Sequence, residues 1–187
     1  MKPRSTEFSA ARQAAALLHQ GLALALHDIS AGRAELQEAA ARFEALGDAR
    51  GRLLASCALV VFIGIADDDY GGFETAAAVV TGTHGAAGAW PDPGDALLVE
   101  AGALTAGSFN ALDAPELAAR AAAIAQALGN ATIAAPLRCC AGLAALGYHH
   151  IGMDLASVLW LELALRPLLA DPALGTSSTP SGLRLVI

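Results

Sequence analysis

The sequence predicts an all-α fold, an α-solenoid of about four antiparallel helix pairs in a right-handed stack. Apolar residues recur every three or four positions along most of the chain, which is the period of an amphipathic helix. Residues 45–49 (ALGDA) also return 82 positions later as residues 127–131 (ALGNA). Two helix pairs of roughly 40 residues each fill such a repeat, because one pair alone cannot bury its apolar face.

The repeated segment is interpreted as a hinge between two helices. Gly47 suits the left-handed position that follows a helix, and Asp48 offers a side-chain oxygen to cap the next helix. Gly129 and Asn130 are expected to play the same two parts in the second copy. Four further pairs of positions correspond at this offset: Cys57 and Cys139, Val61 and Leu143, Phe73 and Leu155, and Thr75 and Ser157.

The first three helices are expected at residues 5–26, 32–46 and 49–66, and a shorter fourth helix is expected to restart at residues 70–73 and to reach about residue 81. The first two each have one apolar stripe, which is typical of a half-exposed helix. The third contains the longest apolar run, from Leu53 to Ala66, and is apolar on every side. We therefore expect this helix at the centre of the stack. The Asp67-Asp68-Asp69 run that follows is interpreted as a solvated turn, because a calcium loop spreads its ligands over alternate positions.

Four more helices follow an irregular loop at 82–93, and they are expected at residues 93–109, 115–128, 131–148 and 153–170. Pro93 and Pro115 fall at first-turn positions, where proline is favoured. Pro136 falls in the second turn of its helix, where we expect a bend. The last helix is apolar nearly all round, so another surface is expected to cover it.

Composition limits the classes of function. The chain has 187 residues, and we divide it into a helical-repeat domain at 1–174 and a flexible linker and C-terminal tail at 175–187. Only 16% of the residues are charged, against roughly 25% in typical soluble domains, so much of the surface is alanine or is covered. A net charge of −7 without a basic patch argues against nucleic-acid binding.

Several features indicate a cytoplasmic protein that does not enter a membrane. The apolar run from Leu53 to Ala66 is shorter than the roughly 20 residues that span a bilayer. Polar residues interrupt the N-terminal segment before Leu22, so no export signal is expected. Three cysteines, two of them adjacent, do not form a disulfide framework.

Residues 41–51 (ARFEALGDARG), the apolar helix after them and the Asp69-Tyr70 turn resemble tetratricopeptide-type helix pairs. More narrowly, they are similar to the helical-repeat domains of bacterial MalT-like transcriptional activators, in which F-x-x-x-G-D-x-x-G begins a unit. The Pro91-Asp92-Pro93 turn and residues 165–169 (LRPLL) also resemble that family, and the resemblance covers roughly residues 33–174. It implies a domain that senses a ligand or a partner protein.

The chain departs from the complete pattern of those regulators. It has neither a Gly-rich, lysine-containing phosphate loop nor a basic helix-turn-helix, so nucleotide hydrolysis and DNA reading are not implied. It also lacks the Trp, Leu, Gly and Tyr pattern of the strict tetratricopeptide consensus. The repeats are therefore degenerate.

No catalytic signature is found, and neither a cofactor nor a metal is expected. His149 and His150 precede Asp154 at a helix–helix turn, but adjacent histidines on a helix do not easily face one ion. Cys139 and Cys140 are assigned to packing, since Cys57 holds the equivalent repeat position. His84 and Asp92 lack an accompanying nucleophile.

Two hypotheses of function remain open. The first is a non-catalytic regulatory module that binds a protein segment or small effector in a groove along the first helix of each pair. The second is a small-molecule-binding protein or enzyme that encloses an apolar ligand between the third, fifth and seventh helices. The residues expected in the groove or ligand site are Cys57, Val61, Phe109, Cys139, His149 and His150.

The last helix and the tail are expected to mediate self-association. A helix at the end of a four-pair stack has one neighbouring side to bury against, and this one lacks the polar face of a terminal cap. The expected interface residues are Trp160, Leu161, Leu165 and Leu169. Alternatively, residues 183–187 fold back as a cap.

Overall fold

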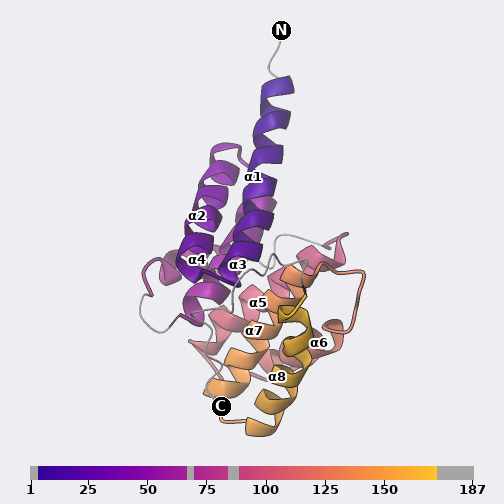
Figure 1. The fold of residues 1–187 in the computed structure, drawn as a ribbon. Helices are drawn as coiled ribbons and strands as arrows, with labels where there is room; N and C mark the ends of the chain where they lie inside the picture. The colour runs from indigo at the N-terminus through magenta and orange to yellow at the C-terminus, as the bar shows by residue number, and fades with distance from the viewer. Residues whose placement is uncertain (1–3, 67–69, 84–88, 172–187) are drawn as a thin grey trace.

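The computed structural model describes residues 4–66, 70–83 and 89–171, and within these ranges it contains eight α-helices and no strand (Figure 1). The all-α prediction is therefore confirmed. The helices are α1 (Arg4–Ala25), α2 (Ile29–Ala45), α3 (Ala49–Gly64), α4 (Phe73–Thr83), α5 (Pro93–Ser108), α6 (Pro115–Ala127), α7 (Ala135–Ile151) and α8 (Leu155–Leu169).

Aspartate side chains begin four of these helices. Asp28 accepts a hydrogen bond from the N–H of Ala31 at 2.9 Å, and Asp48 accepts one from Gly51 at 2.9 Å. Asp92 and Asp154 cap α5 and α8 in the same way. Each carboxylate satisfies an N–H group that has no partner inside the helix and also complements the positive end of the helix dipole.

Helices that are consecutive in the sequence pack as pairs: α1 with α2, α3 with α4, α5 with α6, and α7 with α8. The odd-numbered helices also contact one another in turn, from α1 to α3 to α5 to α7. However, α7 contacts both α3 and α1, whereas each unit of an open stack contacts only its neighbours. The row is thus curled, and the open right-handed solenoid stays a prediction.

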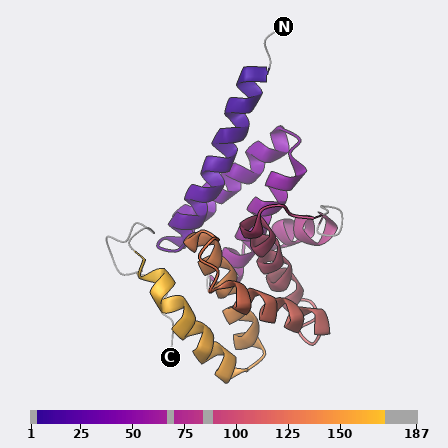
Figure 2. The same cartoon turned by 90° about the vertical axis from the view of Figure 1, so that its right-hand side faces the viewer.

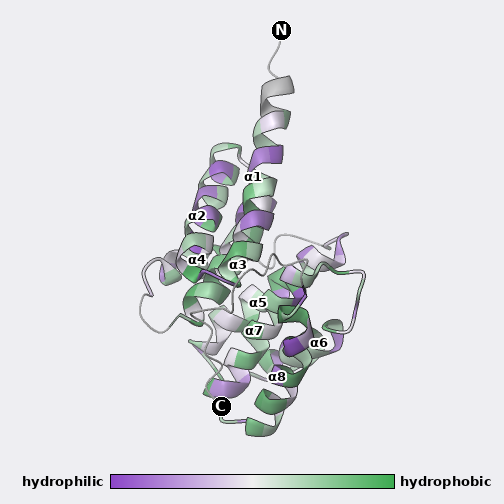
Figure 3. Cartoon of the chain, in the orientation of Figure 1, coloured by the Kyte–Doolittle hydropathy of each residue, from purple (hydrophilic) through white to green (hydrophobic). Residues whose placement is uncertain are grey.

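The core is centred on α3, where every residue from Leu53 to Ile63 is buried. This confirms the central position predicted for that helix. The N-terminal half of α1 projects beyond the other helices (Figures 1 and 2). Hydrophilic residues gather on α1 and α2, whereas α8 is largely hydrophobic (Figure 3).

The start of α7 differs from the prediction. The helix begins at Ala135, so Pro136 lies in its first turn rather than its second. A proline at that position removes no helical hydrogen bond, because the first N–H groups of a helix have no partner within it. The predicted bend inside this helix is therefore wrong.

The second hinge is also built differently from the first. Gly47 adopts the predicted left-handed conformation, with φ of 68°, whereas Gly129 does not have a positive φ. The Asn130 side chain accepts hydrogen bonds from the N–H and hydroxyl of Thr132, which forms a local turn rather than a cap on α7. The prediction that Gly129 and Asn130 repeat the roles of Gly47 and Asp48 is wrong.

Arg138 holds this second hinge instead. Its Nη1 donates to the carbonyl oxygen of Leu128 at 3.0 Å, and its Nε donates to that of Ile133 at 3.0 Å. One guanidinium from α7 thus binds the carbonyl at the end of α6 and the segment that follows it. This use of arginine replaces the glycine cap of the first copy.

The 82-residue offset holds at the starts of α4 and α8 but not at the starts of α3 and α7. Phe73 and Leu155, which correspond at the 82-residue offset, begin α4 and α8 respectively. Ala49 and Ala135, which begin α3 and α7, lie 86 residues apart. The second hinge is therefore longer by four residues.

Three parts of the sequence interpretation lie outside the described residues. They are the acidic turn at 67–69, the loop segment at 84–88 that includes His84, and the linker and tail at 175–187. Within the described part of the chain, no helix combines the length and the apolar character that crossing a membrane requires.

Candidate functional site

An open cleft lies where α6 and α8 pack on either side of the C-terminal part of α7. Its volume is about 570 Å³. The small alanine side chains of α6 form one wall, and Trp160 and Leu161 of α8 form the other. The remaining lining residues come from the end of α7, the turn before α8, the first turn of α8 and the segment before α6. The complete set is Leu112, Asp113, Ala118, Ala121, Ala122, Ala125, Tyr148, His149, Ile151, Gly152, Asp154, Ser157, Trp160 and Leu161.

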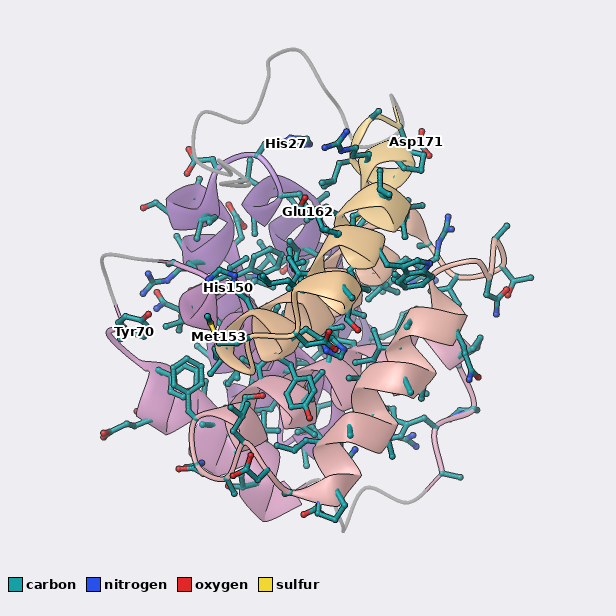
Figure 4. All side chains as sticks on the ribbon, turned by 90° about the horizontal axis from the view of Figure 1, so that it is seen from below. His27, Tyr70, His150, Met153, Glu162 and Asp171 are labelled. Atoms are coloured by element: carbon teal, nitrogen blue, oxygen red, sulfur yellow. The ribbon has the colours of Figure 1, made fainter. Side chains whose placement is uncertain are left out.

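The turn between α7 and α8 shapes one end of the cleft. The N–H of Gly152 donates to the Tyr148 carbonyl at 3.0 Å, and that of Asp154 donates to the His149 carbonyl at 2.9 Å. Met153 between them has a φ of 58°, which is uncommon for a residue with a side chain. This tight reversal places α8 beside α7 and leaves Met153 and the neighbouring His150 exposed (Figure 4).

Asp154 is the central polar group of the cleft. One of its oxygens accepts from the N–H of Ser157 at 3.2 Å, and the other lies 3.1 Å from Nδ1 of His149. Hydrogen bonds from Ser157, followed by the nearby His149, hold the pKa of this carboxyl below its usual range. The carboxylate is therefore ionised at neutral pH and fixes the orientation of the imidazole.

Aromatic rings flank this pair. The ring of Tyr148 meets the imidazole of His149 edge to face, with centroids 5.1 Å apart. Trp160 is about half exposed, with 52% of its surface accessible, and it lines the opposite wall. The cleft thus combines an ordered acid–imidazole pair with aromatic and alanine surface.

His149, Asp154 and Ser157 are held in fixed orientations, but they are not arranged like the catalytic triad of an acyl-transfer enzyme. In such a triad the imidazole stands between the carboxylate and the hydroxyl, so that it can take the proton of the nucleophile. Here Asp154 stands between His149 and Ser157. Among the described residues, no three His, Cys, Asp or Glu side chains converge in a way that could hold a metal ion.

Three of the predicted groove residues lie in the core rather than in the cleft. Cys57, Val61 and Cys139 are fully buried in the core formed by α3, α5 and α7. Burial raises the pKa of the Cys57 thiol, and it raises the pKa of Cys139 to about 11. A ligand bound in the cleft would not reach these side chains.

The other predicted groove residues separate from one another. His149 lines the cleft, whereas His150 is exposed outside its lining. Phe109 packs on Phe73 with ring centroids 4.7 Å apart and approaches Tyr70, so it belongs to an aromatic group beside α4. The structure therefore brings only His149 of this set to the cleft.

The predicted interface residues divide in a similar way. Leu161 and Leu165 are buried within the chain, with 1% and 0% of their surface exposed, so a second chain would not reach them. Leu169 is partly buried against the core, and Trp160 faces the cleft. The exposed large apolar residues of α8 are instead Leu155, Leu159, Trp160 and Leu163.

Sequence reasoning did not assign Tyr148, Asp113 or Ser157 to a site. Tyr148 follows the apolar period of its helix, and Asp113 reads as part of a helix start. The sequence did contain one signal for this site, which is the spacing of His149, Asp154 and Ser157 around a helix–helix turn. Comparison of the chain with protein-family models, curated proteins and solved structures finds no match.

Proposed function

We propose that the protein is a non-catalytic binding module and that the cleft between α6, α7 and α8 binds a small effector. The observation that supports this proposal is the cleft itself. Its volume of about 570 Å³ falls within the roughly 300–1,000 Å³ of typical small-molecule sites. Three of its polar groups, His149, Asp154 and Ser157, lie together at the α7–α8 turn, as in sites that fix the orientation of a ligand.

The charges of the lining favour a ligand with a cationic head. Asp113 and Asp154 are the two carboxylates of the lining, which contains neither lysine nor arginine. The carbonyl end of α7 adds the negative pole of its dipole. The opposite pole, at the start of α8, is already occupied by the Asp154 carboxylate. An ammonium or guanidinium group is therefore the favoured head.

The apolar lining favours an apolar body on the same ligand. Tyr148 and Trp160 offer aromatic faces, which attract cations as well as burying hydrocarbon. The alanine wall of α6 leaves room for a flat or chain-like group. A protein segment that presents a lysine or arginine side chain has the same chemistry, and it is the second candidate because the cleft is open to solvent.

The space between α3, α5 and α7 is less suited to a ligand. A Cβ atom on Gly102 of α5 would lie 2.5 Å from the Cβ of Cys57 on α3, so these helices are already in close contact. The proposed binding therefore uses the cleft rather than an enclosed site around Cys57 and Cys139.

A sensor role in a transcriptional regulator fits the sequence resemblance. In MalT-like activators the helical-repeat domain senses a ligand or partner protein, and we propose that this domain has the same sensing role. The fold proposed with it is a short, curled tetratricopeptide-like stack. Binding of the effector at the α7–α8 turn would then change how the last helix pair is presented.

The fluorescence of Trp160 provides the test. The chain has two tryptophans, so Trp90→Phe leaves Trp160 as the single reporter. The probes are 2-phenylethylamine, the carboxylate 3-phenylpropionate and the neutral 2-phenylethanol. We expect saturable quenching by the amine at concentrations of about 1–10 mM, typical of a fragment-sized ligand, and little effect of the carboxylate.

Two alanine substitutions on α6 serve as a matched pair. Ala122 is exposed and lines the cleft, so Ala122→Trp should fill it and abolish amine binding. Ala119 is exposed on the same helix but outside the lining, so Ala119→Trp should leave binding unchanged. Because each variant adds a third indole, binding is measured for this pair by calorimetry. Equal binding by both variants would refute the cleft, and equal binding of amine and carboxylate would refute the proposed charge preference.

A further inference from the structure

The outer face of α8 carries a regular row of exposed leucines. Leu155, Leu159 and Leu163 follow one another at four-residue spacing, and 63%, 55% and 64% of their surfaces are accessible. We refer to these three residues as the α8 stripe. They point away from Val158, Leu161 and Leu165, which pack into the core. The helix therefore carries leucines on its outer side as well as on its inner side, where Glu162 is also buried.

We propose that the α8 stripe pairs with the same stripe of a second copy of this chain, antiparallel and across a two-fold axis at Leu159. Leu159 is the middle member of the row, so an axis there pairs the largest number of leucines. Leu159 then faces Leu159 of the second copy, and Leu155 faces Leu163 of the second copy. An identical patch on both partners is what a closed two-fold dimer requires.

Charge complementarity supports this antiparallel register. Arg166 is exposed on the last turn of α8, three residues after Leu163. With the axis at Leu159, the position opposite Arg166 is residue 152, in the turn that ends at the Asp154 carboxylate. The guanidinium of each copy can thus approach the acidic end of the other, whereas a parallel pair would place the two Arg166 side chains together.

The exposed apolar area of this face indicates a dimer of modest affinity. Met153, in the turn just before α8, is a further exposed apolar residue, with 77% of its surface accessible (Figure 4). Together with the three leucines it exposes on the order of 500 Å² of mainly apolar surface, which matches the largest patch of a typical monomer, and such patches are often functional. Two such faces give a total interface of about 1,000 Å², at the lower limit for specific association. A dimer with a dissociation constant in the micromolar range is the expected result.

None of the three leucines of the α8 stripe lines the cleft, so replacing Leu159 tests the dimer separately from ligand binding, although the Asp154 carboxylate that Arg166 would approach does line the cleft. Leu159 is more than half exposed, so replacing it should not disturb the fold of one chain. In Leu159→Glu two carboxylates would meet on the axis. We expect sedimentation equilibrium of the wild-type chain between about 1 and 200 μM to show a reversible monomer–dimer equilibrium, and Leu159→Glu to remain a monomer over this range. Ala119→Glu, at an exposed position on α6, is the matched control and should dimerise like the wild type.

Cysteine cross-linking tests the register. The native cysteines are all buried, so an introduced thiol is the one that reacts in the folded chain. Leu159→Cys should form a disulfide-linked dimer with itself under mild oxidation. Leu155→Cys alone should cross-link poorly, but a mixture of Leu155→Cys and Leu163→Cys should form mixed dimers.

A wild-type chain that remains monomeric at 200 μM would overturn the proposal, and so would a dimer that Leu159→Glu leaves intact. Efficient cross-linking of Leu155→Cys with itself would overturn the antiparallel register.

Discussion

Gly102 of α5 packs directly against Cys57 of α3, since a Cβ atom at Gly102 would lie 2.5 Å from the Cβ and 2.6 Å from the Sγ of Cys57. Real Cβ atoms do not approach so closely, so the two helices can lie this near only because residue 102 is a glycine. The contact joins the second and third helix pairs at the centre of the core. It also explains why a small side chain stands at position 57.

We predict that Gly102→Ala lowers the free energy of unfolding by about 1–3 kcal/mol, the usual cost of overpacking a core. Gly147 of α7 is the matched control, because a Cβ there meets no atom within 4 Å. Gly147→Ala should raise the free energy of unfolding by about 0.5–1 kcal/mol through helix propensity. Urea denaturation monitored by circular dichroism measures both, and equal effects of the two substitutions would contradict the close contact.

Local sequence signals were sufficient for most of the helix boundaries. Asp48 was recognised as a cap because an N-cap depends on residues within one turn of it. The second hinge was assigned incorrectly because Arg138, eight residues after Asn130, binds its carbonyl oxygens. No local rule identifies a partner that comes from the next helix.

The candidate site was less predictable than the fold. The cleft exists because α6 and α8 pack on α7 at positions that leave a gap between them, and that spacing depends on tertiary packing. Tyr148 and Trp160 have the apolar period of core residues, and only their exposure distinguishes them. Conversely, Cys57 and Cys139 were named among the groove residues, whereas their equivalent positions in the repeat had indicated packing, and both are fully buried.

The buried cysteines should make the protein less stable at alkaline pH. Burial raises the pKa of Cys139 from 9.0 to about 11, so the folded state binds the thiol proton more tightly than the unfolded state does. The free energy of unfolding should therefore keep its full value below about pH 9 and fall as the pH rises towards 11. Cys139→Ala should reduce this fall. A stability that does not change between pH 8 and pH 11 would contradict the prediction.

The same burial predicts that the cysteines are inert. Neither Cys57, Cys139 nor Cys140 is accessible to solvent, and burial raises the pKa of each thiol. We expect a chromogenic disulfide reagent to label less than one thiol per chain in the folded protein at pH 8, and all three in denaturant. Rapid labelling before unfolding would show that the α3–α5–α7 contact opens readily.

Asp154 should stabilise the protein only while its carboxyl is ionised. Hydrogen bonds from Ser157 and the nearby His149 hold its pKa below the usual range, so the stabilisation is fully present above the ordinary pKa and is lost as the pH falls through the lowered value. Asp154→Asn keeps a side-chain oxygen for the cap but removes the charge. Its Tm should lie below that of the wild type at pH 7, and the two should converge once the pH has fallen below the lowered pKa of Asp154. A Tm difference that persists at low pH would assign the effect to geometry rather than charge.

Of the arginines in α5 to α8, Arg138 should be the one whose loss lowers the free energy of unfolding most. Its two hydrogen bonds, both 3.0 Å long, join α7 to the carbonyl oxygens of Leu128 and Ile133, and its side chain is partly buried. Arg138→Met keeps the apolar stem but leaves both carbonyl oxygens without this donor. We predict a loss of about 1–3 kcal/mol in the free energy of unfolding, as expected for hydrogen bonds from a charged donor.

The pattern of substitutions distinguishes hydrogen bonding from charge. Arg138→Lys keeps the charge but not the planar fork that serves two acceptors, so it should recover only part of the lost stability. Arg12→Met, at an exposed position on α1, is the matched control and should change stability by less than about 0.5 kcal/mol. Hydrogen exchange adds a local readout, because amides in residues 128–134 should exchange faster in Arg138→Met while those of α3 keep their relative protection. Full recovery by lysine, or an unchanged exchange rate in this segment, would show that the second hinge is held by the packing around it and not by the guanidinium.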